Sequence, residues 1–73
     1  MSIVSVKLSE SSPLIDKTLQ EAEFRIRYHC MVVGVEDGNG HLCTIQARRK
    51  FQKDDIVWVV GEEADLSMLE MVI

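Results

Sequence analysis

Histidine and cysteine are the residue types in this 73-residue chain that most readily bind a metal, and they fall into two pairs, His29-Cys30 and His41 with Cys43. Imidazole and thiolate are the usual zinc ligands, and a structural zinc site needs four ligands within about 2.3 Å of one point. A hairpin turn between the pairs would leave Cys30 and Cys43 about four residues out of register, roughly 13 Å apart at about 3.3 Å per residue. We therefore predict no metal site within one chain, and only a site shared between two copies stays open.

The same residues could serve nucleophilic catalysis, because a thiolate activated by a histidine attacks carbonyl groups. The sequence contains no G-x-S-x-G elbow. Cys30 and Cys43 lie in apolar, strand-like surroundings, where a cysteine is ordinarily buried and inert. A chain this short leaves little room for a pocket that excludes water. The glycines form no G-x-x-x-x-G-K phosphate loop, so we predict that the protein is not an enzyme.

Two groups of basic residues could contact an anion. Arg25 and Arg27 follow the first expected helix at alternate positions, and guanidinium groups bind phosphate bidentately; ordinary surface charge is the alternative. Arg48-Arg49-Lys50, with Lys53, forms a basic patch in an acidic chain. It could contact an anionic ligand, a lipid surface or an acidic neighbouring domain, or it could be a solvated loop that keeps one end of the sheet soluble.

Asp55 directly precedes an apolar strand. It could act as a general base, but aspartate at such a position more often fixes a turn by accepting hydrogen bonds from backbone N–H groups. We expect the second role.

The first half of the chain reads as a strand followed by a helix. Residues 3–8 alternate mostly between apolar and polar, which predicts a strand with one buried face. Thr18 and Glu21 form a capping box that starts a helix. Leu19, Ala22 and Ile26 fall on one face of that helix. β-Branched and aromatic residues after Glu23 predict that the regular helix ends early in a looser turn.

The second half reads as three strands and a helix. Residues 31–35 form a strand, Asp37-Gly38-Asn39-Gly40 is a hairpin signal, and a third strand is expected near residues 41–45. A polar loop over residues 47–53 leads to the strand 56–60, which is apolar on both faces. Acidic residues after Gly61 favour the start of a last helix, whose apolar stripe would be Leu66, Leu69, Val72 and Ile73.

The element order β-α-β-β-β-α predicts a small α+β sandwich, with a mainly antiparallel sheet and two helices on one face. Two helices cover only one face, whereas the strand 56–60 needs cover on both. A second copy of the chain would supply that cover, so we predict a symmetric homodimer.

The composition excludes several classes of protein. The chain is 47% hydrophobic and carries a net charge of −4, which argues against a general nucleic-acid binder. It holds no run of about 18 apolar residues that would cross a membrane and no secretory leader. Cys30 and Cys43 form no C-x-x-C pair, so reduced thiols in a cytosolic compartment are expected.

The order and spacing of several short motifs resemble the C-terminal domain of the regulator-of-potassium-conductance family, also called the TrkA-C domain. The resemblance runs over almost the whole chain, 1–73. Three family glycines are replaced here, by Asp16, His29 and Asp54, which alters the turns because glycine permits φ angles that other residues resist. The residues that match the family pattern are Leu14, Ile15, Lys17, Thr18, Leu19, Arg25, Tyr28, Val32, Val33, Val35, Asp55, Val57, Val59 and Gly61.

The resemblance implies a non-enzymatic, dimeric regulatory domain on the cytoplasmic side of a potassium or cation transporter, channel or antiporter. It also implies that this chain is a fragment of that larger membrane protein. Some members bind cyclic di-AMP at the two-fold axis. By position, the ligand-binding residues would be Leu19, Gln20, Arg25 and Met31, although Met31 lacks the polar group that such members offer. A structural dimerisation module without a ligand is the alternative.

Overall fold

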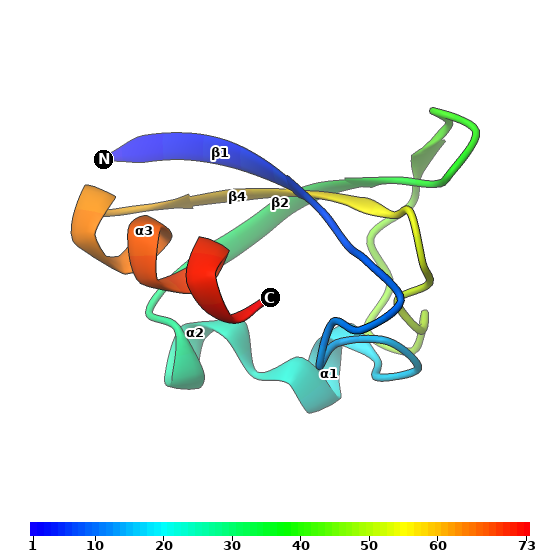
Figure 1. Cartoon of the computed structure of the whole chain (residues 1–73), viewed down its shortest axis with the longest axis horizontal. Helices are drawn as coiled ribbons and strands as arrows, with labels where there is room; N and C mark the ends of the chain where they lie inside the picture. Colours follow the sequence, from blue (N-terminus) through cyan, green and yellow to red (C-terminus); the bar gives the residue numbers. More distant parts are fainter.

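Four strands form a single antiparallel sheet in the spatial order β1-β4-β2-β3 (Figure 1). The computed structural model describes every residue from Met1 to Ile73. The long strands are β1 (Ser2–Lys7), β2 (Met31–Glu36) and β4 (Ile56–Gly61), and β3 (Leu42–Cys43) has only two residues. β4 lies between β1 and β2 and pairs with both, so the last strand of the chain is the centre of the sheet.

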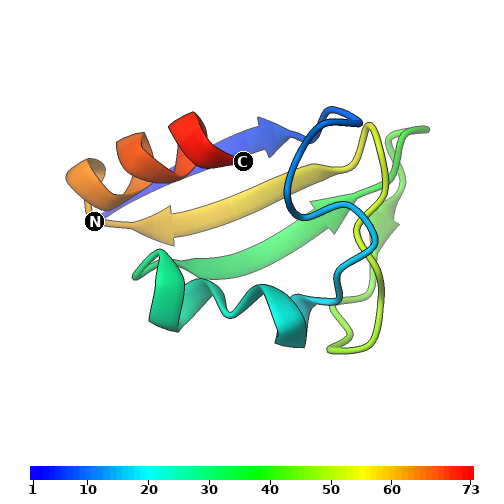
Figure 2. The same ribbon diagram turned by 60° about the horizontal axis from the view of Figure 1, so that its bottom comes forward.

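All the helices lie on one side of this sheet, and the opposite face is bare (Figures 1 and 2). They are α1 (Leu19–Ala22), α2 (Phe24–Arg27) and α3 (Glu63–Val72). α3 contacts β1 and β4, and α2 contacts β2. The predicted α+β sandwich is therefore confirmed, with one change, because the first predicted helix is divided into α1 and α2.

The start and the break of this divided helix have separate local causes. The Thr18 side chain accepts a hydrogen bond from the Glu21 N–H, and the Glu21 carboxylate accepts one from the Thr18 N–H, which confirms the predicted capping box. The hydrogen bond from the Thr18 backbone also lowers the pKa of Glu21. Glu23 then takes the left-handed conformation, with φ 51° and ψ 51°, and ends α1. The predicted early end is confirmed, but the predicted shared face of Leu19, Ala22 and Ile26 is wrong, because the break at Glu23 turns Ile26 away from the core and leaves it 72% exposed.

Replacing Glu23 with glycine should stabilise the fold by about 1 kcal/mol, because a left-handed backbone costs a residue with a Cβ about 1–2 kcal/mol. The exposed ion pair that Glu23 makes with Arg27 is worth little by comparison. Glu70→Gly is the matched control, since Glu70 is exposed within α3 and glycine there should destabilise by about 0.5–1 kcal/mol. Urea denaturation of both variants checks the opposite signs, and two losses of similar size would contradict the left-handed break.

Left-handed backbone also occurs at the three positions where the family pattern has glycine. The φ angles are 66° at Asp16, 57° at His29 and 71° at Asp54. Aspartate tolerates this region better than most residues because its short side chain bonds locally. The turns are therefore kept although the glycines are not.

The predicted hairpin is confirmed, and β3, the strand that follows its turn, is shorter than predicted. The Asp37 carboxylate accepts hydrogen bonds from the backbone N–H groups of Asn39 and His41, and these bonds lower the pKa of Asp37. Gly40 has φ 81°. β3 covers only Leu42–Cys43 and pairs with the end of β2, whereas a strand over residues 41–45 was expected.

The core lies between the sheet and the helices. Leu66 and Leu69 of the predicted stripe on α3 are buried, whereas Val72 is exposed and Ile73 is only half-buried against the core. The loop 47–53 is present, but it is not wholly polar, because Phe51 is 2% exposed and its ring lies 6.1 Å from that of Phe24. This loop therefore anchors one end of the core.

The bare face of the sheet is apolar. In β4, Val57 and Val59 are buried against the helices, whereas Ile56, Trp58 and Val60 alternate onto the other face and are only half-buried. The indole of Trp58 donates a hydrogen bond to Glu36 on β2 (3.3 Å). A single chain thus covers only one face of β4, and further exposed apolar side chains belong to Ile3, Met31, Val33 and Leu42.

Candidate anion-binding groove

The four residues predicted to bind a ligand line one groove. This groove, of about 460 Å³, lies between α1, α2 and the start of β2, and Leu19, Gln20, Arg25 and Met31 are in its walls. Its volume falls in the range of small-molecule sites, about 300–1,000 Å³. Sequence reasoning missed the other residues that line it, which are Glu23, Phe24, Ile26, Cys30 and Val32.

The break at Glu23 positions the polar and apolar side chains of this groove. α1 contributes Leu19 and Gln20, and α2 contributes Arg25 and Ile26 after the chain has changed direction. β2 supplies Met31. Because β3 pairs only with Val35 and Glu36, the first half of β2 has no strand neighbour on its outer edge, and the groove opens there.

Arg25 is the free cation of the groove. Its guanidinium makes no ion pair and no hydrogen bond within the chain. The carboxylate of Glu23, the only acid in the groove, lies 3.4 Å from the Arg27 guanidinium nitrogen Nε instead. An unpaired guanidinium among apolar walls is suited to a phosphate, which it can bind through two parallel hydrogen bonds.

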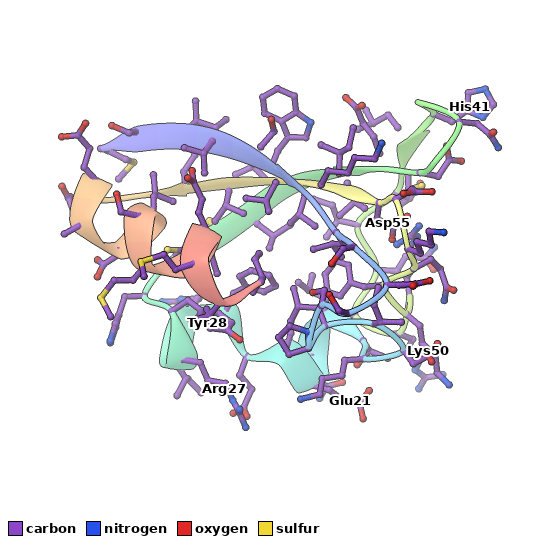
Figure 3. The ribbon with its side chains drawn as sticks, in the orientation of Figure 1. Glu21, Arg27, Tyr28, His41, Lys50 and Asp55 are labelled. Carbon is purple, nitrogen blue, oxygen red and sulfur yellow. The ribbon has the colours of Figure 1, made fainter.

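The alternate positions of Arg25 and Arg27 suggested that both contact one anion, but the two side chains line different hollows. Arg27 points away from the sheet (Figure 3) and lines a different hollow with Tyr28, His29 and Asp65. The two guanidinium groups diverge because α2 is helical rather than extended.

Cys30 closes the inner end of the groove and is not poised as a nucleophile. Its side chain is buried, and its thiol donates a hydrogen bond to the carbonyl of Tyr28 (3.0 Å). Burial raises the pKa of the thiol, which keeps it protonated at neutral pH.

In the basic patch at residues 48–53, Arg49 has a structural role, whereas its neighbours Arg48 and Lys50 lie on the surface. Asp55, 1% exposed, accepts hydrogen bonds from Arg49 Nη1 (2.8 Å) and Nη2 (3.2 Å) and from the Gln52 backbone N–H (2.8 Å). The hydrogen bonds that the Arg49 guanidinium donates to Asp55 also raise the pKa of Arg49. The predicted turn-fixing role of Asp55 is thus confirmed, and Arg49 is a structural ion partner rather than a solvated charge. Arg48 and Lys50 are exposed.

The four candidate zinc ligands lie apart. Cys30 lies against Gly61 at the end of β4, whereas His41 is at the tip of the hairpin at the other end of the molecule (Figure 3). The structure brings no three histidine, cysteine or acidic side chains together in a geometry that could hold a metal ion. None of its helices is both long and apolar enough to span a bilayer.

The comparisons with known proteins agree on the fold. A family model described as the TrkA-C domain matches residues 3–73. No curated protein matches the chain. Solved structures with the same arrangement include the RCK C domain of the potassium transport protein KtrA in complex with cyclic di-AMP, which is 21% identical with a TM-score of 0.84 over 99% of this chain and 82% of that one.

A protein solved in complex with promotor DNA also appears among these structures. The RCK_C domain dimer of S. agalactiae BusR in complex with cyclic di-AMP is 16% identical, with a TM-score of 0.84 over 99% of this chain and 95% of that one. BusR bound to its busAB-promotor DNA is 17% identical, with a TM-score of 0.83, and there the chain corresponds to 35% of the other protein. Identities this low show a shared fold.

The fold is that of an RCK C-terminal domain. The family match extends over nearly the whole chain, and the chain belongs to the TrkA-C domain family.

Proposed function

We propose that this domain is a regulatory module that binds a nucleotide carrying phosphodiester groups, with cyclic di-AMP as the best candidate, and that it acts as a homodimer. The groove itself supports this most, because it brings Leu19, Gln20 and Met31 together with the unpaired guanidinium of Arg25. Two relatives in fold, KtrA and BusR, were solved with cyclic di-AMP.

The chemistry of the groove suits such a ligand. Arg25 would bind a phosphate, and Gln20 offers an amide for hydrogen bonds with a base or a ribose. Leu19, Ile26 and Met31 give apolar surface for the flat face of an adenine, and methionine adapts well to aromatic rings. Because the groove is open along β2, a second copy would close it over the ligand, which predicts one ligand for two chains.

The homodimer is supported by the apolar surface that one chain leaves bare. The outer face of the sheet and the open side of the groove adjoin at Met31, and both carry exposed apolar side chains. Contiguous apolar surface of this kind marks an interaction site. A ligand bound between two copies would favour one dimer arrangement over another, and the attached protein would follow that shift in population.

We infer that the attached protein is a potassium or cation transporter, channel or antiporter. This domain would then lie on the cytoplasmic side of the membrane, as part of a longer chain or assembly. The likeness to KtrA, described as a potassium transport protein, favours it. The likeness to BusR, solved on promoter DNA, supports a second candidate, the sensor domain of a DNA-binding regulator. In that case the DNA contact would lie outside this acidic domain.

Nuclear magnetic resonance of the labelled domain tests the location of the ligand. Addition of cyclic di-AMP should shift the backbone amide signals of residues 19–32 and leave those of the hairpin, residues 37–43, in place. Shifts that gather on the hairpin, or on the basic loop at residues 48–50, would contradict the groove. A folded dimer with no shifts would favour the alternative of a structural dimerisation module.

Replacing Val33 with aspartate is expected to shift the domain from dimer to monomer by at least about tenfold in dissociation constant, since burying an unpaired carboxylate in an apolar contact is strongly unfavourable. Val33 is 44% exposed and lies two residues after Met31 in β2. It is not part of the core cluster, so the change leaves the core intact. Sedimentation velocity at micromolar concentration measures the shift.

The matched control for this dimer test is Met71→Asp, because Met71 is 85% exposed on α3, away from the groove. It should leave the dimer unchanged. A monomeric wild type would rule out the homodimer, and a dimer lost only with Met71→Asp would move the interface to α3.

A further inference from the structure

A second groove continues the first along the start of β2. It measures about 360 Å³ and shares Arg25, Cys30 and Met31 with the first groove. His29 and Glu62 lie in its other walls. Arg25 therefore stands at the junction of two hollows, and His29 is the other side chain of the second hollow that can carry positive charge and is not already paired.

His29 occupies its position at a conformational disadvantage. Its φ is 57°, where a residue with a Cβ is less favourable than glycine by about 1–2 kcal/mol. Its imidazole is exposed and makes no hydrogen bond or ion pair within the chain. This left-handed residue follows the end of α2 and turns the chain so that the Cys30 N–H reaches the Phe24 carbonyl (3.4 Å). The backbone of His29 thus serves the turn, whereas its imidazole is left free for a ligand.

We propose that His29 provides a second contact to the anion held by Arg25, and that the affinity for this anion rises as the pH falls. This inference rests on the proposed function, because it concerns the same phosphodiester ligand. A ring N–H of His29 would donate to the phosphate beside the Arg25 guanidinium, and the imidazolium form would add a full positive charge.

Charged groups face His29 from two sides, in the second groove and in the hollow behind it. In the second groove they are Arg25, the Glu62 carboxylate and the amino group of Met1, and the last two lie 3.9 Å apart. In the hollow behind His29 they are Arg27 and Asp65, beside Tyr28. The Cys30 thiol stays neutral because burial raises its pKa.

The direction of the pH effect follows from these charges. Histidine side chains gain their charge between about pH 8 and pH 5, whereas a phosphodiester keeps its negative charge over that range. An anion beside His29 stabilises the protonated ring, so binding takes up a proton and tightens as the pH falls.

Calorimetric titration of the domain with cyclic di-AMP at pH 5.5 and pH 8.0 tests the inference. The wild type should bind about tenfold more tightly at pH 5.5, the effect of one charge-assisted hydrogen bond. Titrations in two buffers of different ionisation enthalpy should show a net uptake of protons. His29→Gly should abolish both effects and, because glycine suits the left-handed backbone, should fold at least as well as the wild type.

His41→Gln is the matched control, since His41 is the only other histidine and lies on the hairpin, far from α2 (Figure 3). This variant should keep the full pH dependence. Binding with equal affinity at both pH values, or a pH dependence that survives His29→Gly, would overturn the role of His29 and leave the groove standing. No binding by the wild type at either pH would overturn the proposed function as well.

Discussion

Arg25→Ala is expected to weaken the binding of cyclic di-AMP on the order of a hundredfold. The variant removes two hydrogen bonds from a charged donor to a phosphate, each worth about 1.5–3 kcal/mol, and 1.4 kcal/mol corresponds to a factor of ten in affinity. Arg25 is exposed and makes no ion pair or hydrogen bond within the chain, so the variant should keep its thermal stability. Calorimetric titration at one pH and salt concentration measures the loss.

Arg48→Ala is the control for general electrostatics. It removes the same charge from an exposed position without an ion pair in the basic loop. A specific site predicts a change of less than about threefold, because exposed charges at a distance are largely screened. Equal losses in the two variants would mean that the ligand responds only to net charge, which would contradict a phosphate contact at Arg25.

Asp55→Ala is expected to lower the free energy of unfolding by about 3–5 kcal/mol, the effect of removing one partner from a buried ion pair. The Arg49 guanidinium and the Gln52 N–H would both lose their acceptor. A domain of this length has only about 4–11 kcal/mol of stability at roughly 0.05–0.15 kcal/mol per residue. A substantial unfolded fraction is therefore expected at physiological temperature.

Urea denaturation at a fixed protein concentration measures this loss, because the stability of a dimer depends on concentration. Glu10→Ala is the control. Glu10 forms an exposed pair with Lys53 at 3.9 Å, and such pairs contribute about 0–1 kcal/mol. If Asp55→Ala stays within 1 kcal/mol of the wild type, the pair with Arg49 does not hold the loop to β4.

Local signals predicted the local structure well. The capping box at Thr18 and the Asp37 hairpin were correct because their hydrogen bonds join residues two to four apart. The burial of Phe51 and the pairing of Arg49 with Asp55 were not predicted, since a loop acquires a core residue only when the distant helix start packs on it. The exposure of Ile26 was missed because the residues after Glu23 indicated an early end of the helix, but not the change of direction that the left-handed backbone at Glu23 imposes.

The candidate site was predicted only through the family resemblance. Composition and spacing gave no reason to group Leu19 and Gln20 with Met31, which lie on different elements. Of the four residues, only Arg25 was also predicted from its chemistry, as a phosphate contact. Arg27, which was predicted to contact the same anion, lines a different hollow.

The most direct test of the central proposal is a calorimetric titration of the wild-type domain with cyclic di-AMP at pH 7, with ATP as a control, on a sample whose dimeric state has been measured. Saturable binding with one ligand per two chains, and no comparable heat with ATP, is the predicted result. A folded domain that gives no heat with cyclic di-AMP would contradict the sensor function and leave a structural dimerisation domain in its place.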